Sequence, residues 1–196
     1  MKNEKPTITI SDFIRKAPSE MQIEMLAGAG GISQREIASA RIQKLGLALA
    51  GFAHYIHPGR LQIVGQSEIS YLDQLEKPRR REAIRRLELE KICCVLITKN
   101  LQPPAELLEI ADEVGLPVLR TGQVSSAAIT VVSGFLLEVL APQQTLHGVL
   151  VGLYGIGVLI LGESGIGKSE CALDLIARGH NLISDDSVIV KRIGGK

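Results

Sequence analysis

The sequence is poor in aromatic residues, which make up 3% of its 196 residues and include no Trp. It therefore lacks the aromatic platform on which single-stranded nucleic acids stack their bases. Net charge is also scarce, at +1, so no overall electrostatic argument favours nucleic acid. The longest apolar runs, near residues 128–141 and 149–161, are interrupted or shorter than the ~20 residues that span a bilayer. The chain is expected to bind neither nucleic acid nor membrane.

Cysteine is equally sparse, with only Cys93, Cys94 and Cys171. Their number is odd, their spacing matches no metal site, and each lies in an apolar segment. We expect buried, reduced thiols, which are typical of a cytoplasmic protein. The polar segment 1–6 has no apolar core, so no signal peptide is predicted there.

The strongest motif in the chain is a phosphate-binding loop with the pattern Gly, four residues, Gly-Lys-Ser. Glycines in such a loop let backbone N–H groups close around an anion. Lys168 brings a positive charge to the β- and γ-phosphates, and the Ser169 hydroxyl is a candidate Mg²⁺ ligand. The eight predicted nucleotide-binding residues are Gly162, Glu163, Ser164, Gly165, Ile166, Gly167, Lys168 and Ser169.

The segments around this loop favour a true phosphate site over a chance glycine-rich turn. Residues 157–161 are apolar and predict a buried strand, and residues 169–178 predict a helix that ends at Gly179. Such a helix directs its N-terminal N–H groups and the positive end of its dipole at the phosphates.

The first half of the chain predicts an α/β domain. Strands are expected at residues 23–27, 37–42, 60–65, 92–98 and 117–120, and helices from Asp12 (with Ser11 as N-cap) and at 68–75, 105–113 and 125–140. The strand–helix–strand order over 92–120 predicts a parallel unit with a right-handed crossover. We assign residues 1–130 to an N-terminal assembly or regulatory domain and residues 131–196 to a phosphate-loop domain.

A basic cluster covers residues 77–87. One interpretation is a patch that binds anions or nucleic acid. The other is a solvated helix face, because Glu82, Glu88 and Glu90 are interleaved with the arginines. The second interpretation is favoured.

Three further polar residues accompany the loop. Residues 149–153 and 157–161 predict an antiparallel hairpin, which would bring His147 near the phosphates. Residues 182–186 predict a strand that ends in Asp185 and Asp186. A carboxylate there can hold Mg²⁺ or accept a proton from an attacking hydroxyl, whereas the alternative is an ordinary polar turn.

Taken together, these segments resemble the bifunctional HPr kinase/phosphorylase family over essentially the whole chain. The matching segments are His147 to Val149, residues 154–159, the loop 162–169, residues 178–180, and Asp185 with Asp186, together with Arg60 to Gln62, Gly65, Glu68 and residues 101–104. The loop, with Gly165 nested between two other glycines, also resembles that of phosphoenolpyruvate carboxykinases. The resemblance implies an α/β fold with an N-terminal domain and a carboxykinase-like kinase core.

The resemblance implies a function. The enzyme phosphorylates a serine of HPr, the phosphocarrier of the sugar phosphotransferase system, with ATP or pyrophosphate and Mg²⁺. It also removes that phosphate by phosphorolysis, and it works as a homo-hexamer in the bacterial cytoplasm. The implied catalytic residues are His147, Lys168, Asp185 and Asp186. One aspartate is the acid/base in both directions, and the spacing does not settle which.

The resemblance also implies a kinase domain that continues beyond Lys196, so the chain is expected to be truncated at its C-terminus. The continuation would carry a further Mg²⁺-binding carboxylate, a catalytic arginine and elements that contact HPr. A parallel sheet lacking some strands would expose an apolar edge. Two alternatives therefore stay open, namely a nucleotide-binding regulatory fragment without turnover and a small-molecule or carboxykinase-like kinase that shares only the loop.

Overall fold

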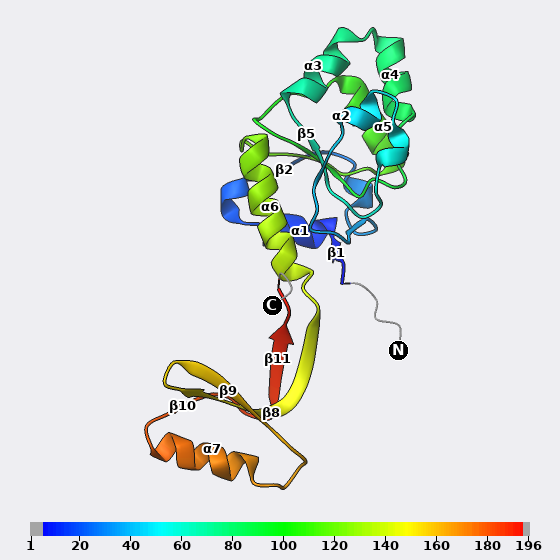
Figure 1. Cartoon of the computed structure of the whole chain (residues 1–196). Helices are drawn as coiled ribbons and strands as arrows, with labels where there is room; N and C mark the ends of the chain where they lie inside the picture. The colour runs from blue at the N-terminus through cyan, green and yellow to red at the C-terminus, as the bar shows by residue number, and fades with distance from the viewer. Residues whose placement is uncertain (1–5, 194–196) are drawn as a thin grey trace. The chain divides into compact units, whose positions relative to one another are not determined.

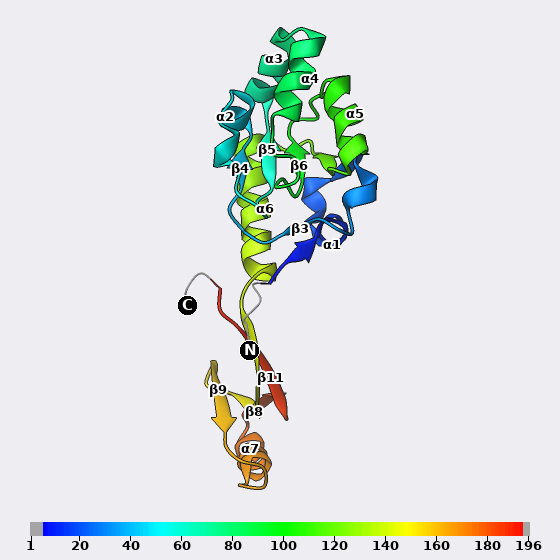
Figure 2. The same ribbon diagram turned by 90° about the vertical axis from the view of Figure 1, so that its right-hand side faces the viewer.

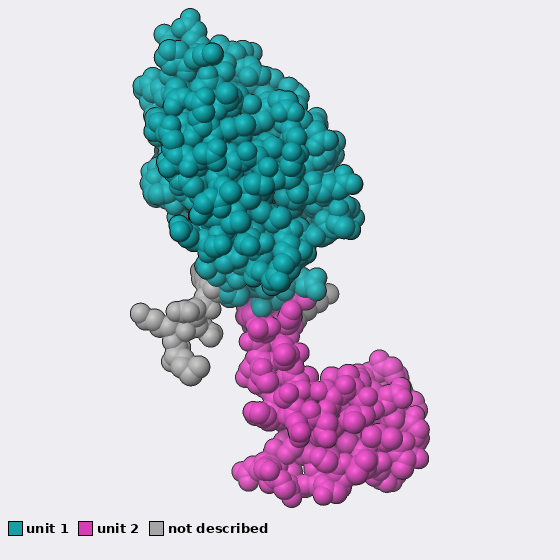
Figure 3. All heavy atoms as spheres, turned by 180° about the vertical axis from the view of Figure 1, so that it is seen from behind, with its two compact units in different colours: residues 1–141 teal, residues 142–196 magenta. Residues whose placement is uncertain are grey.

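The computed structural model describes residues 6–193, which form two compact units, Met1–Ala141 and Pro142–Lys196 (Figure 3). The division falls later than the expected one between residues 130 and 131, which lies inside the helix α6 (Ser125–Val139). A helix is one cooperative element, so the whole of α6 stays with the first unit.

The first unit contains a five-stranded mixed sheet in the order β2-β7-β6-β5-β4. Strands β4 to β7 run parallel to one another and β2 runs antiparallel to β7. The predicted strand–helix–strand unit is confirmed, because β6 and β7 are parallel neighbours joined through α5. The strands are β2 (Glu24–Ala27), β4 (Gln43–Lys44), β5 (Gln62–Val64), β6 (Val95–Ile97) and β7 (Val118–Arg120).

Helices cover both faces of this sheet (Figures 1 and 2). Side chains of α2 (Gly46–Leu49), α3 (Gln66–Gln74), α4 (Lys77–Arg85) and α5 (Ala105–Val114) pack into one core cluster, and those of α1 (Ile10–Lys16) and α6 into another. Along β5, Ile63 faces the second cluster and Val64 the first, as the two-residue period of a strand requires. A small ribbon of β1 (Ile8–Thr9) and β3 (Glu36–Ile37), and the 3-10 turns Ser19–Met21, Ala29–Gly31 and Ala53–Tyr55, complete the unit.

Two local predictions for this unit are wrong. The side chain of Thr9, not Ser11, accepts the Asp12 N–H and caps α1. Residues 37–42 do not form one strand, because pairing stops at Ile37 and resumes at Gln43. The cap is a local bond three residues long, and both Thr and Ser are ordinary capping residues. At residues 38 and 43 the backbone N–H groups instead donate to the distant carbonyls of Gly59 and Leu61, which local propensity does not reveal.

The basic cluster lies on and just after α4, and most of its basic side chains are exposed, as expected for the solvated helix face favoured above, whereas Arg80 is largely buried. Its guanidinium groups form ion pairs with carboxylates of α5 and of α4 itself, namely Arg80–Glu106, Arg81–Glu109, Arg81–Glu113, Arg85–Glu113 and Arg86–Glu82. The first four of these pairs join α4 to α5.

The second unit is built around the long strand β8 (Gln143–Leu153). Strand β9 (Ile156–Leu161) pairs with β8 as the predicted antiparallel hairpin, and β10 (Asn181–Ser184) and β11 (Ser187–Lys191) also pair with β8. Every pairing in this described sheet is antiparallel, which differs from the incomplete parallel sheet expected for the kinase core. Helix α7 (Lys168–Ala177) connects β9 to β10 and packs on the sheet through Ala172.

The core of the second unit is small, and several large apolar side chains are exposed. Only Val149, Val151 and Ala172 form its buried cluster. The exposed apolar residues include Leu161, Leu173, Leu182, Ile183 and Ile189. Cys171 on α7 is exposed too, which corrects the prediction of a buried thiol, whereas Cys93 and Cys94 are buried as predicted and all three cysteines are free. Within residues 6–193 no helix is long and apolar enough to cross a membrane.

Candidate functional site

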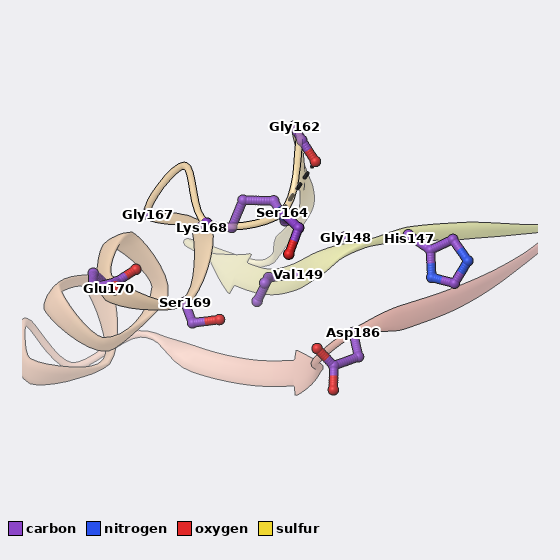
Figure 4. A pocket seen from close by; sticks show the side chains of 11 residues that line it. His147, Gly148, Val149, Gly162, Ser164, Gly167, Lys168, Ser169, Glu170 and Asp186 are labelled. Atoms are coloured by element: carbon purple, nitrogen blue, oxygen red, sulfur yellow. Dashed lines mark hydrogen bonds between the residues drawn. The ribbon is translucent and has the colours of Figure 1, made fainter.

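The phosphate-binding loop lies between β9 and α7, in the strand–loop–helix order that the sequence predicted (Figure 4). Gly165 has φ +81 and Gly167, the N-cap of α7, has φ +96. Both values lie in the left-handed region that residues with a Cβ adopt only at a cost. The glycines at these positions therefore set the path of the loop and turn it into the helix.

Lys168 is the first residue of α7, and its side chain folds back across the loop. Its Nζ donates hydrogen bonds to the carbonyl oxygens of Gly162, at 3.0 Å, and Glu163, at 2.7 Å. The ammonium is thus held against the first residues of the loop, and the loop continues directly into the N-terminus of α7. An ammonium beside a helix N-terminus is a favourable setting for phosphate oxygens.

Gly148 of β8 connects this loop to the pair of aspartates. It lies opposite Leu161, the residue before the loop, in the β8–β9 register. Its N–H also donates to the carbonyl oxygen of Asp186, at 3.2 Å. A Cβ at position 148 would stand 2.6 Å from the carbonyl oxygen of Ile160, so only glycine fits between these strands without displacing one of them.

A solvent-open cavity of about 490 Å³ lies between the phosphate loop, β8 and the turn that joins β10 to β11. His147 and Asp186 line it together with the loop, and Figure 4 shows Ser169 and Asp186 on opposite sides of it. The structure therefore brings together candidate residues that are separated by up to 39 positions in sequence, since they run from His147 to Asp186. The lining residues are His147, Gly148, Val149, Gly162, Ser164, Gly165, Gly167, Lys168, Ser169, Glu170 and Asp186.

Three predicted site residues do not line this cavity. Glu163 and Ile166 belong to the loop, and the side chain of Ile166 is exposed. Asp185 is the third predicted site residue outside the cavity lining. Its carboxylate Oδ1 accepts a hydrogen bond from the backbone N–H of Asp186, at 3.0 Å. The two adjacent aspartates, which the sequence does not distinguish, thus have different surroundings.

The lining residues fit a magnesium-bound polyphosphate. The glycine-rich loop leaves backbone N–H groups accessible, Lys168 supplies positive charge, and the Ser169 hydroxyl is a hard oxygen donor. No cluster of three or more His, Cys, Asp or Glu side chains suited to a metal occurs among residues 6–193. This donor set matches the habit of Mg²⁺, which keeps several waters and shares phosphate oxygens with few protein ligands.

Sequence reasoning missed three lining residues, Gly148, Val149 and Glu170. Glu170 is the acidic residue in the first turn of α7, so its position three residues after the N-cap was a usable signal. The places of Gly148 and Val149 follow from the pairing of β8 with β9, and no local sequence pattern indicates them.

Two family models match the chain. The model described as HPr Serine kinase N terminus matches residues 8–136, and the one described as HPr Serine kinase C-terminal domain matches residues 138–196. The chain belongs to the HPr kinase/phosphorylase family. The resemblance noted from its motifs is therefore confirmed.

Curated relatives in this family agree. The chain is 46% identical over 186 residues to the HPr kinase/phosphorylase of Geobacter sulfurreducens, an alignment of 95% of this chain and 58% of that protein. It is 44% identical over 183 residues to the HPr kinase/phosphorylase of Caldicellulosiruptor bescii, covering 93% and 59%. The chain thus spans a little under three fifths of the length of these relatives.

The chain also aligns with one solved structure, that of the CBS and DRTGG domains of the regulatory region of Clostridium perfringens pyrophosphatase complexed with activator, diadenosine tetraphosphate. The alignment covers 59% of this chain and 43% of that one, with 15% identity and a TM-score of 0.42. A similarity of this size supports no inference about fold or ligand.

Proposed function

We propose that this chain carries the phosphate-binding part of an enzyme that phosphorylates a serine of HPr and removes that phosphate by phosphorolysis. The observation that supports it is the shared cavity. A phosphate loop, a histidine and a carboxylate face the same 490 Å³ space, and phosphoryl transfer needs an anion cradle beside an acid/base.

Each residue has a proposed role. When bound, ATP or pyrophosphate is the phosphoryl source, and Mg²⁺ on the Ser169 hydroxyl screens the charge on its oxygens. The loop N–H groups and Lys168 hold the phosphates and stabilise charge on the transferred phosphoryl group. Asp186 accepts the serine proton in the kinase direction and returns it to the serine oxygen in the reverse direction. His147 orients the attacking phosphate. We prefer Asp186 to Asp185 as the acid/base because Asp186 lines the cavity.

The wider context is part of the same proposal. Membership of the family supports HPr as the protein partner, control of carbon metabolism, a cytoplasmic location and assembly as a homo-hexamer. Kinship of the loop with that of phosphoenolpyruvate carboxykinases is likewise proposed. Analytical ultracentrifugation would test the hexamer directly.

A phosphoryl-transfer assay tests the function. The protein extended to its natural stop codon is mixed with HPr, Mg²⁺ and ATP, and then phospho-HPr with inorganic phosphate, and this chain is assayed alongside. We expect transfer in both directions and a loss of at least about 100-fold in the K168A variant, since a positioned charge of this kind contributes about 3 kcal/mol or more to transition-state stabilisation. The K44A variant, which changes an exposed lysine of the first unit, is the control.

One second candidate is a nucleotide-binding regulatory module without turnover. The exposed apolar side chains and small core of the second unit favour it for this chain taken alone. It predicts ATP binding without transfer to HPr. Transfer to a metabolite with indifference to HPr would instead favour the small-molecule kinase and overturn the proposal.

A further inference from the structure

The two aspartates occupy a short interruption between β10 and β11, and the pairing with β8 has the same register on both sides of it, from Ser184 onward. A separate register shift lies earlier in β10, between Leu182 and Ser184. Ser184 of β10 lies opposite Leu150, and Ser187 of β11 lies opposite His147. From Ser184 to Ser187 the chain advances by as many residues as β8 does between those partners. The interruption therefore adds no residue to the strand, and it changes only the local backbone direction.

That change of direction is concentrated at Asp186, which has φ +66. The left-handed conformation costs a residue other than glycine about 1–2 kcal/mol. In an uninterrupted strand the position would be extended instead. A residue held in this way needs surrounding contacts that outweigh the cost.

Four hydrogen bonds supply those contacts. The Gly148 N–H donates to the Asp186 carbonyl at 3.2 Å, the Ser187 N–H to the Asp185 carbonyl at 2.8 Å, and the Ser184 hydroxyl to the Ser187 carbonyl at 2.8 Å. The fourth joins the Asp186 N–H to the Asp185 carboxylate at 3.0 Å. It is the one bond of the four that depends on the side chain of Asp185.

We propose that Asp185 is a positioning residue, whose carboxylate oxygen holds the Asp186 backbone so that the Asp186 side chain faces the phosphate loop. The inference rests on the proposed function for the role of Asp186. A short acidic or amide side chain that accepts a bond from a nearby backbone N–H offers the backbone an alternative to the strand ladder. Asp185 thus acts through its acceptor oxygen, and neither its charge nor its proton takes part in the reaction.

Two substitutions separate these roles. D185N keeps an acceptor oxygen at the same place but removes the charge and the acid/base function. D185A removes the acceptor oxygen as well. In the protein extended to its natural stop codon, we expect D185A to lower kcat for transfer to HPr by about tenfold, the worth of one ordinary intramolecular hydrogen bond. D185N should stay within about threefold of the wild type, with KM for ATP little changed in both.

The pH profile of kcat distinguishes loss of the acid/base from a general loss of structure. D185N should keep the pH profile of kcat, because the titrating carboxylate at position 186 is retained. D186N, the matched change at the neighbouring site, should lose about 100-fold or more in kcat and flatten that profile. Equal losses in D185N and D185A would overturn the inference, since they would show that Asp185 acts through its charge or its proton.

A measurement on this chain alone distinguishes failure of the inference from failure of the proposed function. The rate at which the Asp186 amide exchanges with water, followed by NMR, should rise by about tenfold in D185A and by less than about threefold in D185N. If the exchange rates behave so while wild-type protein never modifies HPr, the proposed function is wrong and the positioning role stands. Unchanged exchange in D185A would refute the positioning role.

Discussion

Arg35 offers the sharpest test of how the first unit holds together, and its replacement by alanine is the perturbation. The side chain precedes β3 and donates hydrogen bonds to four backbone carbonyl oxygens in two distant segments. Burial lowers the pKa of Arg35, but an arginine remains charged in proteins. The acceptors are the carbonyls of Leu89, at 2.7 Å, Ile92, Val114, at 3.0 Å, and Gly115, at 2.8 Å.

The expected loss can be worked out from these contacts. Val114 is 40% exposed, so water can replace the guanidinium near there at little cost. Leu89 and Ile92 are buried, and each charged hydrogen bond to such a site contributes about 1.5–3 kcal/mol. The R35A variant should therefore lose about 3–6 kcal/mol of unfolding free energy from the two buried acceptors, or roughly 6–24 °C in Tm.

Urea unfolding of this chain, followed by far-ultraviolet circular dichroism, measures that loss. R35K should recover only part of it, because a lysine ammonium lacks the planar donors that reach several carbonyls at once. R79A, which changes an exposed arginine of α4, should stay within about 0.5 kcal/mol of the wild type. If the R35A midpoint coincides with that of R79A, the four carbonyl contacts do not stabilise the unit and the reasoning is refuted.

Two further predictions concern the site and the α4–α5 contact. G148A should lose about 1–3 kcal/mol of stability, because its methyl group crowds the carbonyl of the paired strand, and it should weaken binding of a fluorescent ATP analogue. G134A is the control, since open space surrounds its added methyl group, and it should change neither stability nor binding. Equal behaviour of the two variants would contradict the close packing at Gly148. Two interactions lower the pKa of Glu106 below its ordinary value of 4.5. The larger is a hydrogen bond that its carboxylate accepts from its own backbone N–H, and the smaller is the contact with the Arg80 guanidinium. A carboxyl whose pKa is lowered on folding stabilises the folded protein at pH values above its unfolded-state pKa. E106Q should therefore be less stable than the wild type at pH 7, and the difference between their urea midpoints should disappear as the pH falls below 4.5. A difference that stays constant with pH would exclude this linkage.

Much of the first unit was predictable because its signals are local. The strand at 92–98, the helix opened by Pro104 and closed by Gly115, and the strand at 117–120 follow from apolar runs and from residues that begin or end helices. The structure places α5 at Ala105–Val114, with Gly115 in the left-handed conformation that closes it. Where distant partners interrupt a local signal, as at residues 37–43, the prediction was wrong, because Ala38 and Gln43 bond to the carbonyls of Gly59 and Leu61.

The sequence by itself determined the phosphate loop, since glycine spacing, Lys168, Ser169 and the flanking periodicity are all carried by adjacent residues. Only the tertiary structure separated Asp185 from Asp186 and set His147 beside the loop. The physical reason is strand register. Pairing with β8 places Ser187 opposite His147 and joins the Gly148 N–H to the Asp186 carbonyl, and such long-range pairing depends on the whole sheet rather than on any one segment.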